Sequence, residues 1–141
     1  MMFSKRCFIA LCTLLTLSVS MQAHALSEGD MAPDFTLKNM QGENLKLSEQ
    51  RGNIILINFW ASWCGPCKKS FPFMEDLHAQ YNNSGLEVIA ISVDENKQDA
   101  LAFLTETSAS FGLFHDPKGD IAQKFNVMGM PTSYLIDRDG N

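Results

Sequence analysis

Positive charge is scarce in this sequence of 141 residues, which holds 11 lysine and arginine residues against 16 aspartate and glutamate residues. The formal net charge is −5. A balance this acidic argues against nucleic acid or an anionic membrane surface as a partner. Beyond residue 25 the sequence also lacks a long apolar run, a low-complexity tract and an internal repeat. That part of the chain therefore indicates neither a membrane-spanning helix nor a repeat architecture.

The first 25 residues have the three-part pattern of a secretory signal peptide. Lys5 and Arg6 give a positive start, Cys7–Val19 is almost entirely apolar or small, and Ala23-His24-Ala25 supplies small residues before a cleavage point. The apolar stretch of 13 residues is shorter than the roughly 20 that a transmembrane helix needs, although an uncleaved anchor remains the alternative. We therefore expect export to the periplasm and one mature domain, residues 26–141. Its formal charge is −7, because Lys5 and Arg6 are removed.

Cysteine is scarce as well. Two of the four cysteines lie in the predicted signal peptide, so the mature domain keeps only Cys64 and Cys67. A bridge between residues this close removes little entropy from the unfolded chain, so the pair is not a stabilising framework. It has instead the spacing of a redox pair.

The same shortage argues against metal and haem sites. A structural zinc site needs four ligands, and neither His78 nor His115 has metal-ligand spacing from the cysteine pair. A c-type haem needs histidine directly after the second cysteine, where this chain has Lys68. We therefore expect no metal and no cofactor, and we interpret the two histidines as surface or packing residues.

Hydrophobic periodicity predicts strands that alternate with helices. Alternating apolar residues around Gln41-Gly42 indicate a β-hairpin, and the apolar run Asn53–Trp60 fits a central strand buried on both faces. Helical spacing follows the cysteines as far as Tyr81. The other predicted elements are a buried strand (86–93), a helix (100–107), a short strand (111–114), a short helix (121–125) and a last strand (132–136). This order predicts an α/β fold with a mixed central sheet.

Several acidic residues lie between these elements, and they are most simply turn and cap residues: Asp94, Asp116, Asp120 and Asp137. The chain ends at Asn141, directly after the predicted turn 137–140. A returning strand is expected to follow such a turn. We therefore expect either a truncated sequence or a natural chain that leaves a sheet edge open.

A buried strand, the tetrad Cys64-Gly65-Pro66-Cys67 and a helix follow one another directly. The first cysteine of such a tetrad lies where the helix begins, and it faces unpaired backbone N–H groups at the positive end of the helix dipole. Helix N-termini lower a cysteine pKa from about 8.5 by one to several units. We therefore predict that Cys64 is the attacking nucleophile. Cys67, one turn into the helix, is the more buried thiol that resolves the mixed disulfide.

Neighbouring residues shape the predicted site. Pro66 sets a backbone angle compatible with the first helical turn, and with Gly65 it keeps the tetrad short and stiff. Trp63 either provides an apolar face beside the sulfur or packs in the core, and the sequence favours neither. Lys68 and Lys69 are able to add positive potential, but a solvated helix face is their simpler explanation.

The segment Asn58–Lys68 (NFWASWCGPCK) resembles the active-site segment of the thioredoxin family. Pro72 matches the proline that kinks the same helix in that family, and Gly129-Met130-Pro131-Thr132 resembles its cis-proline loop. The resemblance implies a thioredoxin-like fold with a redox disulfide between Cys64 and Cys67. It also implies a cis Met130–Pro131 bond, in a loop whose residues Met130, Pro131 and Thr132 bind the extended backbone of the substrate. A further C-terminal strand and helix are expected in such a fold and are missing from this sequence.

The long spacing between the two motifs indicates which group of thioredoxin-like proteins the sequence resembles. Cys67 and Pro131 are 64 residues apart, more than we expect for plain thioredoxin, and the surplus lies around Glu95–Pro117. The sequence resembles the exported TlpA/ResA-like disulfide reductases in three features: this insertion, the hairpin segment from Ala32 to Leu37 and the signal peptide. Within the mature domain, the resemblance covers residues 32–141. The resemblance implies a protein that reduces disulfides of exported proteins and receives electrons from a membrane or periplasmic thiol donor.

Two residues depart from this pattern. Asn58 replaces the buried aspartate of cytoplasmic thioredoxins. Ser70 stands where many TlpA-like reductases that serve cytochrome c maturation carry glutamate. With both carboxylates absent, deprotonation of Cys67 needs water or another group, which weakens an assignment to haem-protein maturation.

Two other functions remain open. A thioredoxin-fold binding module or chaperone would hold thiol-containing clients through the Met130–Pro131 groove without turnover. The opening Ala32–Leu37 also resembles peroxiredoxins, but these carry threonine three residues before the peroxidatic cysteine, where this chain has Ala61. Peroxide reduction is therefore the weaker alternative.

Overall fold

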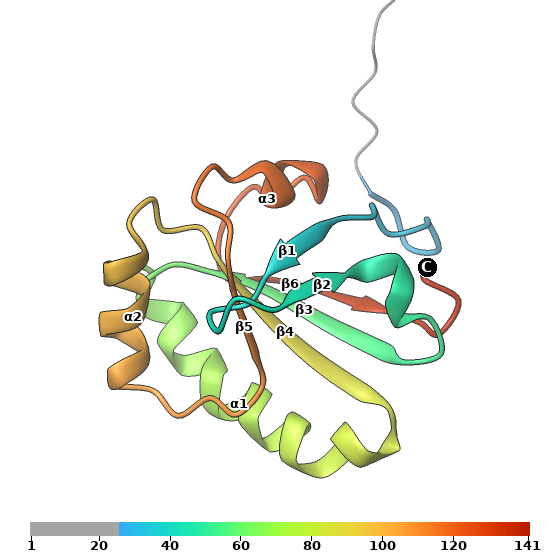
Figure 1. The fold of residues 1–141 in the computed structure, drawn as a ribbon, viewed down its shortest axis with the longest axis horizontal. Helices are drawn as coiled ribbons and strands as arrows, with labels where there is room; N and C mark the ends of the chain where they lie inside the picture. The colour runs from blue at the N-terminus through green and yellow to red at the C-terminus, as the bar shows by residue number, and fades with distance from the viewer. Residues whose placement is uncertain (1–25) are drawn as a thin grey trace, which may run out of the picture.

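A computed structural model describes residues 26–141 (Figure 1). The predicted signal peptide, residues 1–25, lies outside the described residues. The strands are β1 (Thr36–Lys38), β2 (Asn44–Lys46), β3 (Ile54–Trp60), β4 (Leu86–Ser92), β5 (Gly112–His115) and β6 (Thr132–Ile136). The helices are α1 (Gly65–Tyr81), α2 (Lys97–Thr105) and α3 (Asp120–Lys124), with short 3₁₀ turns η1 (Leu47–Gln50) and η2 (Asn82–Ser84). The predicted alternation of strands and helices is confirmed.

A four-stranded sheet forms the centre of the fold, with the strand order β5-β4-β3-β6. β3 pairs in parallel with β4 and β4 pairs in parallel with β5, whereas β6 runs antiparallel to β3. The register places Phe59 of β3 opposite Thr132 of β6. The loop before β6 therefore lies at the same end of the sheet as the residues that follow β3. The predicted mixed α/β architecture is confirmed.

The hairpin β1-β2 forms a separate two-stranded antiparallel sheet, with Leu37 opposite Leu45. Its turn is held by the side-chain oxygen of Asn39, which accepts hydrogen bonds from the backbone N–H groups of Gln41 and Glu43. Gly42 has a φ of 96° in this turn, a left-handed conformation that glycine adopts without steric cost. The hairpin and its turn are therefore where the sequence predicts them.

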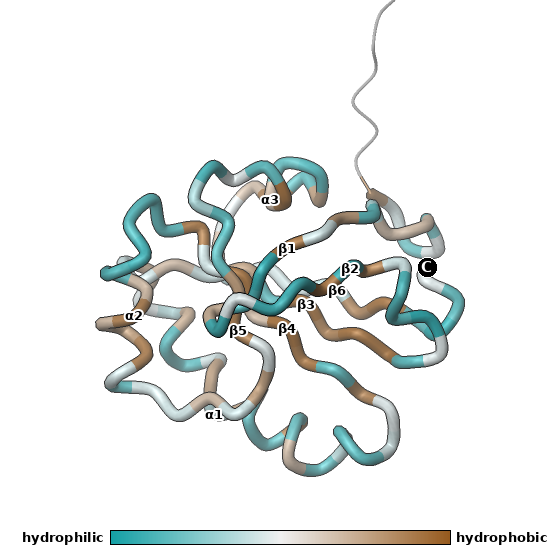
Figure 2. The backbone as a smooth tube through the Cα atoms, viewed as in Figure 1, coloured by the Kyte–Doolittle hydropathy of each residue, from teal (hydrophilic) through white to brown (hydrophobic). Residues whose placement is uncertain are grey.

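Two clusters of buried apolar side chains cover the two faces of the sheet, and β3 contributes to both because its side chains alternate. Ile57 and Phe59 pack with residues of the hairpin and α3, whereas Trp60 packs with residues of α1 and α2. Figure 2 shows the central strands as a strongly hydrophobic part of the chain. Each such buried side chain contributes about 1.5–3 kcal/mol relative to an exposed one. This packing fixes the end of β3, from which the cysteine pair follows.

The boundaries of α2 differ from the prediction. The helix begins at Lys97, three residues before the predicted start, because the Asn96 side chain accepts a hydrogen bond from the Gln98 N–H at 3.0 Å and caps the first turn. It ends at Thr105, two residues before the predicted end.

Within residues 26–141, no helix combines the length and the apolar character that crossing a bilayer requires.

Candidate functional site

Cys64 and Cys67 lie where β3 gives way to α1, and the two sulfurs form a disulfide with a Cα separation of 5.3 Å. Four residues, 61–64, connect the strand to the helix. The Cys64 N–H donates to the Ala61 carbonyl at 3.1 Å, and the Cys67 N–H donates to the Cys64 carbonyl at 3.1 Å. The strand–tetrad–helix order predicted from the sequence is therefore present, and it forms a tight turn.

Cys64 is the N-cap residue of α1. Its Sγ accepts a hydrogen bond at 3.3 Å from the Cys67 N–H, which it shares with the Cys64 carbonyl. Cys64 is 5% exposed and Cys67 is 0% exposed, which is the order of burial that the sequence predicts. In the reduced protein, this position at the positive end of the helix dipole favours a thiolate at Cys64.

The prolines and tryptophans near the cysteine pair lie in different environments. Pro66 lies in the first turn of α1, and Pro72 lies inside the same helix. Trp63 is 70% exposed, so the interpretation that it packs in the core is wrong. The buried tryptophan is Trp60, whose ring lies 4.7 Å from Phe103 of α2 and 5.2 Å from Phe71 of α1, measured between ring centroids.

The loop before β6 contains the cis peptide bond Met130–Pro131, as the thioredoxin resemblance implies. The Thr132 hydroxyl donates to the Gly129 carbonyl at 2.6 Å and closes this loop. Met130 packs against the apolar cluster that contains both cysteines. The structure therefore brings the two motifs together, although 64 residues separate Cys67 from Pro131.

A groove of about 490 Å³ runs between α1 and strands β3 and β6, and Asn58 and Ser70 line it together with apolar side chains such as Phe73 and Leu135. Asn58 is 1% exposed; its Nδ2 donates to the Ser133 hydroxyl at 2.8 Å, but its Oδ1 has no hydrogen-bond partner. The Ser70 hydroxyl donates to the Cys67 carbonyl at 2.8 Å. No carboxyl group is among the residues that line this groove.

A second hollow, of about 380 Å³, opens beside Cys64 and is bounded by Gly65, Lys68, Asp99 of α2 and Glu106, the residue that follows α2. The Lys68 ammonium contacts the Glu106 carboxylate at 2.5 Å. The hydrogen bond and the positive charge of Lys68 lower the pKa of Glu106. Lys68 therefore forms an ion pair across the hollow, which the sequence did not predict.

The site residue that sequence reasoning missed is Asp94. This side chain is interpreted above as a turn or cap residue, but its buried carboxyl accepts hydrogen bonds from the backbone and the hydroxyl of Ser62, two residues before Cys64. Asp116 does cap a helix, because its carboxylate accepts from the N–H groups of Ile121 and Ala122 at the start of α3.

Within residues 26–141, no group of three or more metal-ligating side chains gathers.

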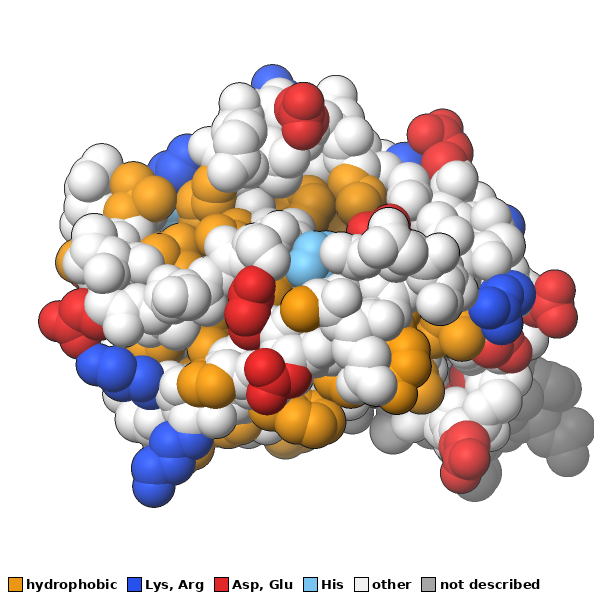
Figure 3. All heavy atoms as spheres, turned by 90° about the horizontal axis from the view of Figure 1, so that it is seen from below, with side chains coloured by type: hydrophobic (Ala, Val, Ile, Leu, Met, Phe, Trp, Pro, Cys, Tyr) orange, Lys and Arg blue, Asp and Glu red, His pale blue; other side chains and the backbone are white. Residues whose placement is uncertain are grey.

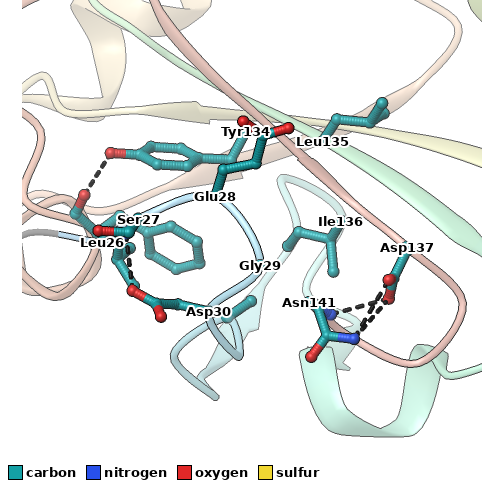
Figure 4. A pocket seen from close by; sticks show the side chains of 12 residues that line it. Leu26, Ser27, Glu28, Gly29, Asp30, Tyr134, Leu135, Ile136, Asp137 and Asn141 are labelled. Carbon is teal, nitrogen blue, oxygen red and sulfur yellow. Dashed lines mark hydrogen bonds between the residues drawn. The ribbon is translucent and has the colours of Figure 1, made fainter.

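A further pocket, of about 410 Å³, lies between residues 26–30 and the C-terminal end of β6 (Figure 4). Tyr134, Ile136 and Asp137 line it, and the Ser27 N–H donates to Asp30 at its rim at 2.7 Å. Because Ile136 pairs with Ile55 at the beginning of β3, this pocket lies at the opposite end of the strand from the cysteine pair. It contributes no residue to the candidate site.

Comparisons with known proteins agree with this geometry. A family model described as the AhpC/TSA family matches residues 28–141. The chain is 38% identical over 116 residues to the thiol-disulfide oxidoreductase ResA of Oceanobacillus iheyensis, covering 79% of this chain and 60% of that protein. It is also 38% identical over 118 residues to the thioredoxin-like protein YneN of Bacillus subtilis, covering 82% of this chain and 68% of that protein. The chain therefore spans less than two thirds of the length of this ResA protein.

A similar solved structure is that of a Chlorobium tepidum protein assigned as a thiol:disulfide interchange protein DsbE. It superposes with a TM-score of 0.79 at 45% sequence identity, covering 83% of this chain and 82% of that chain. The predicted thioredoxin-like fold is therefore confirmed.

Proposed function

Because this chain belongs to the AhpC/TSA family, with thioredoxin-like relatives, we propose that it is an exported thiol–disulfide oxidoreductase that reduces disulfides of exported proteins. The observation that carries this proposal is the Cys64–Cys67 disulfide at the N-terminus of α1, with Cys64 Sγ as the capping atom. A pair held this way is formed and broken readily, since the helix start stabilises the thiolate that exchange requires.

In the proposed reaction, the Cys64 thiolate attacks one sulfur of a client disulfide. A mixed disulfide forms between Cys64 and the client, and the second client sulfur leaves as a thiolate that takes up a proton. Cys67 then loses its proton and attacks the Cys64 sulfur, which releases the first client sulfur. Two electrons pass from the protein to the client, and the protein is left with the Cys64–Cys67 disulfide. A membrane or periplasmic thiol donor restores the dithiol.

The loop Met130–Thr132 is proposed to bind the extended backbone of the client beside the sulfurs. Its proximity supports this role, because Met130 packs against the cluster that contains Cys64 and Cys67. The exposed ring of Trp63 offers an apolar surface next to the attacking sulfur. Neither region carries a charged side chain, so apolar contacts and main-chain hydrogen bonds are expected to dominate client binding.

The proposed direction is reduction of clients. An oxidant arises when its reduced form is unusually stabilised, above all by a very low thiolate pKa at the first cysteine. Gly65 and Pro66 offer the Cys64 sulfur no cation and no side-chain donor, and they lie nearest to it in the chain. The missing carboxylates at Asn58 and Ser70 act in the opposite direction, but from a greater sequence distance.

Export is part of the proposal and is supported by the signal-peptide pattern of residues 1–25. Peroxide reduction is disfavoured because Ala61, in the position where peroxiredoxins carry threonine, is buried and has no hydroxyl group. A binding module without turnover remains the alternative that experiment must separate from a reductase.

The decisive experiment compares the variants Cys67→Ser and Cys64→Ser, both expressed with the leader segment and recovered from the periplasm. A reductase that lacks its resolving thiol stalls as a mixed disulfide, so Cys67→Ser is expected to carry covalently bound clients that dithiothreitol releases. Cys64→Ser, which keeps one thiol but not the nucleophile, is the matched control and is expected to carry few. Equal trapping by the two variants, or client binding that survives in a Cys64→Ser/Cys67→Ser double variant without covalent capture, would favour the binding module.

A further inference from the structure

Asp94 follows the end of β4 and is 3% exposed. Its two carboxyl oxygens lie 3.1 and 3.0 Å from the Ser62 backbone nitrogen, and Oδ1 accepts from the Ser62 hydroxyl at 2.6 Å. The Ser92 hydroxyl donates to Oδ2 at 2.7 Å. Both donors of Ser62 are thus bound to one buried carboxyl group.

Asp94 is itself held firmly. Its N–H donates to the Ser92 hydroxyl at 3.1 Å, and its carbonyl lies 2.6 Å from Nε2 of His115 at the end of β5. Within residues 26–141, no lysine or arginine forms an ion pair with its carboxyl group. Burying a carboxyl group costs free energy unless it is hydrogen-bonded. The donors of Ser62 and Ser92 offset this cost for Asp94.

Ala61 is buried in the apolar cluster around the cysteines, but the connection from β3 to α1 has few other hydrogen bonds. Within it, the Cys64 N–H donates to the Ala61 carbonyl, a contact internal to the turn. Among the hydrogen bonds of the described residues, only those to Asp94 join residues 61–63 to another part of the fold. Asp94 therefore provides the hydrogen bonds that hold Ser62, and with it the path of the chain into Cys64.

We infer that Asp94 is a positioning residue for the reactive sulfur. By fixing Ser62 it holds Cys64 Sγ over the start of α1, where the Cys67 N–H reaches it at 3.3 Å. This inference rests on the proposed function, since it concerns the reactivity of the Cys64 thiolate. The inference also predicts the direction in which the Cys64 pKa changes when Asp94 is replaced. A negative charge near a thiolate disfavours it, so loss of the charge alone would lower this pKa. Loss of the position would raise it.

The test is the pH dependence of Cys64 alkylation by iodoacetamide in the reduced protein. Loss of the restraint in Asp94→Ala is expected to raise the alkylation midpoint by about 0.5–1 pH unit, part of the lowering that a helix start provides. Below the midpoint this corresponds to alkylation about three- to tenfold slower. Asp94→Asn keeps one acceptor oxygen and is expected to shift the midpoint by less. Ser62→Ala loses only the hydroxyl donor and gives a second, milder variant if Asp94→Ala does not fold.

Asp116→Asn is the matched control, because Asp116 is equally buried but binds the start of α3 and not the loop. It is expected to lower stability without moving the midpoint. An unchanged midpoint in the Asp94 and Ser62 variants, or a shift matched by Asp116→Asn, would make Asp94 merely structural and overturn the inference. A lowered midpoint would mean that charge dominates and would overturn it too. A wild-type midpoint at the ordinary cysteine value would instead contradict the proposed function.

Discussion

On the Cys64 side of the disulfide, the buried carboxyl group of Asp94 accepts hydrogen bonds from both donors of Ser62, whereas on the Cys67 side the groove has no carboxyl group and Asn58 Oδ1 has no partner. The two sulfurs are bonded to each other, yet their surroundings differ in charge and in hydrogen bonding. This contrast supports the proposal that the site is organised around Cys64 as the attacking sulfur. Fixing a nucleophile at a helix start makes it reactive, while the resolving thiol needs only to be near and to lose a proton when required.

The hollow beside Cys64 and the groove between α1 and β6 also differ in charge. The hollow next to Cys64 is bounded by charged side chains, including Asp99 of α2 and the pair that Lys68 of α1 forms with Glu106. The groove between α1 and β6 is mostly apolar, and Phe73 and Leu135 along it are exposed. Figure 3, which views the molecule from the side where α1 lies in Figure 1, shows hydrophobic side chains that reach the surface between charged ones.

The largest expected effect is a difference in stability between variants of Trp60, the last residue of β3, and Trp63, in the connection that follows it. Trp60→Ala removes a fully buried ring that packs against both Phe71 and Phe103, and it is expected to lower the free energy of unfolding by about 3–5 kcal/mol. Trp63→Ala removes an exposed ring and is expected to change it by no more than about 0.5 kcal/mol. Urea unfolding of the disulfide form measures both. Similar losses in the two variants would show that the exposed ring is structural.

The next effect compares the two sulfurs directly. In the reduced, folded protein, Cys64 is expected to react with iodoacetamide at pH 7 about a hundredfold faster than Cys67, because Cys64 caps the helix and Cys67 is completely buried. Mass spectrometry of the peptides that carry each cysteine measures the two rates. Denatured protein is the control, where the rates should converge. Equal rates in the folded protein would remove the distinction on which the comparison rests.

A smaller effect follows from placing a carboxyl group on the Cys67 side. Asn58→Asp introduces an acid where no cation lines the groove, and burial raises the pKa of the introduced acid in the folded state. The variant should therefore lose about 1–3 kcal/mol of stability at pH 7. The loss is present above the unfolded pKa of about 3.9 and shrinks as the pH falls toward it.

Thermal unfolding at pH 7 and at pH 4 measures this dependence. Asn58→Ala is the matched control, since it loses the bond to Ser133 without adding a charge and should be destabilised equally at both pH values. A variant Asn58→Asp that is as stable as wild type at pH 7 would mean that the groove already accommodates an acid.

The smallest effect concerns the charged hollow beside Cys64. Lys68 lowers the pKa of Glu106 through a hydrogen bond and its charge, so Lys68→Ala should return the pKa of Glu106 toward its ordinary value. A carboxylate with a lowered pKa stabilises the fold at pH values above its ordinary pKa, and this stabilisation is lost as the pH falls. Because both partners are exposed, the contribution is small. NMR titration of the Glu106 side chain measures the shift, and Lys69→Ala is the control. A Glu106 pKa that does not move in Lys68→Ala would show that the ion pair does not persist in solution.

Local patterns made much of this molecule predictable. The β-branched run of β3, the helical spacing of α1 and the residues of β6 are sequence-local signals, and the structure has each element within a residue or so of its predicted bounds. The start of α2 was missed because a single capping side chain, Asn96, extends the helix beyond its apolar pattern. The exposure of Trp63 was undecided because a loop residue carries no periodicity from which its direction follows.

The role of Asp94 was not predictable from neighbouring residues, because 32 residues separate it from Ser62 in the chain. Parallel pairing brings them together: Trp60 lies opposite Ser92 at the ends of β3 and β4, so the residues two positions beyond each end are side by side. That register was the available signal. It becomes informative only once the two strands are known to be neighbours.

Whether the Cys64–Cys67 pair reduces disulfides depends on its reduction potential, which equilibration with a glutathione redox buffer measures. The protein is incubated at a series of ratios of reduced to oxidised glutathione, the thiols are trapped by acid and alkylation, and the fractions of dithiol and disulfide are read by mass spectrometry. A reductant holds its electrons weakly, so at a glutathione poise of about −200 mV the Cys64–Cys67 pair is expected to be mostly disulfide, as a pair with a potential of about −270 mV would be. A protein that is mostly dithiol at that poise would have the potential of an oxidant, which would contradict the proposed reduction of clients.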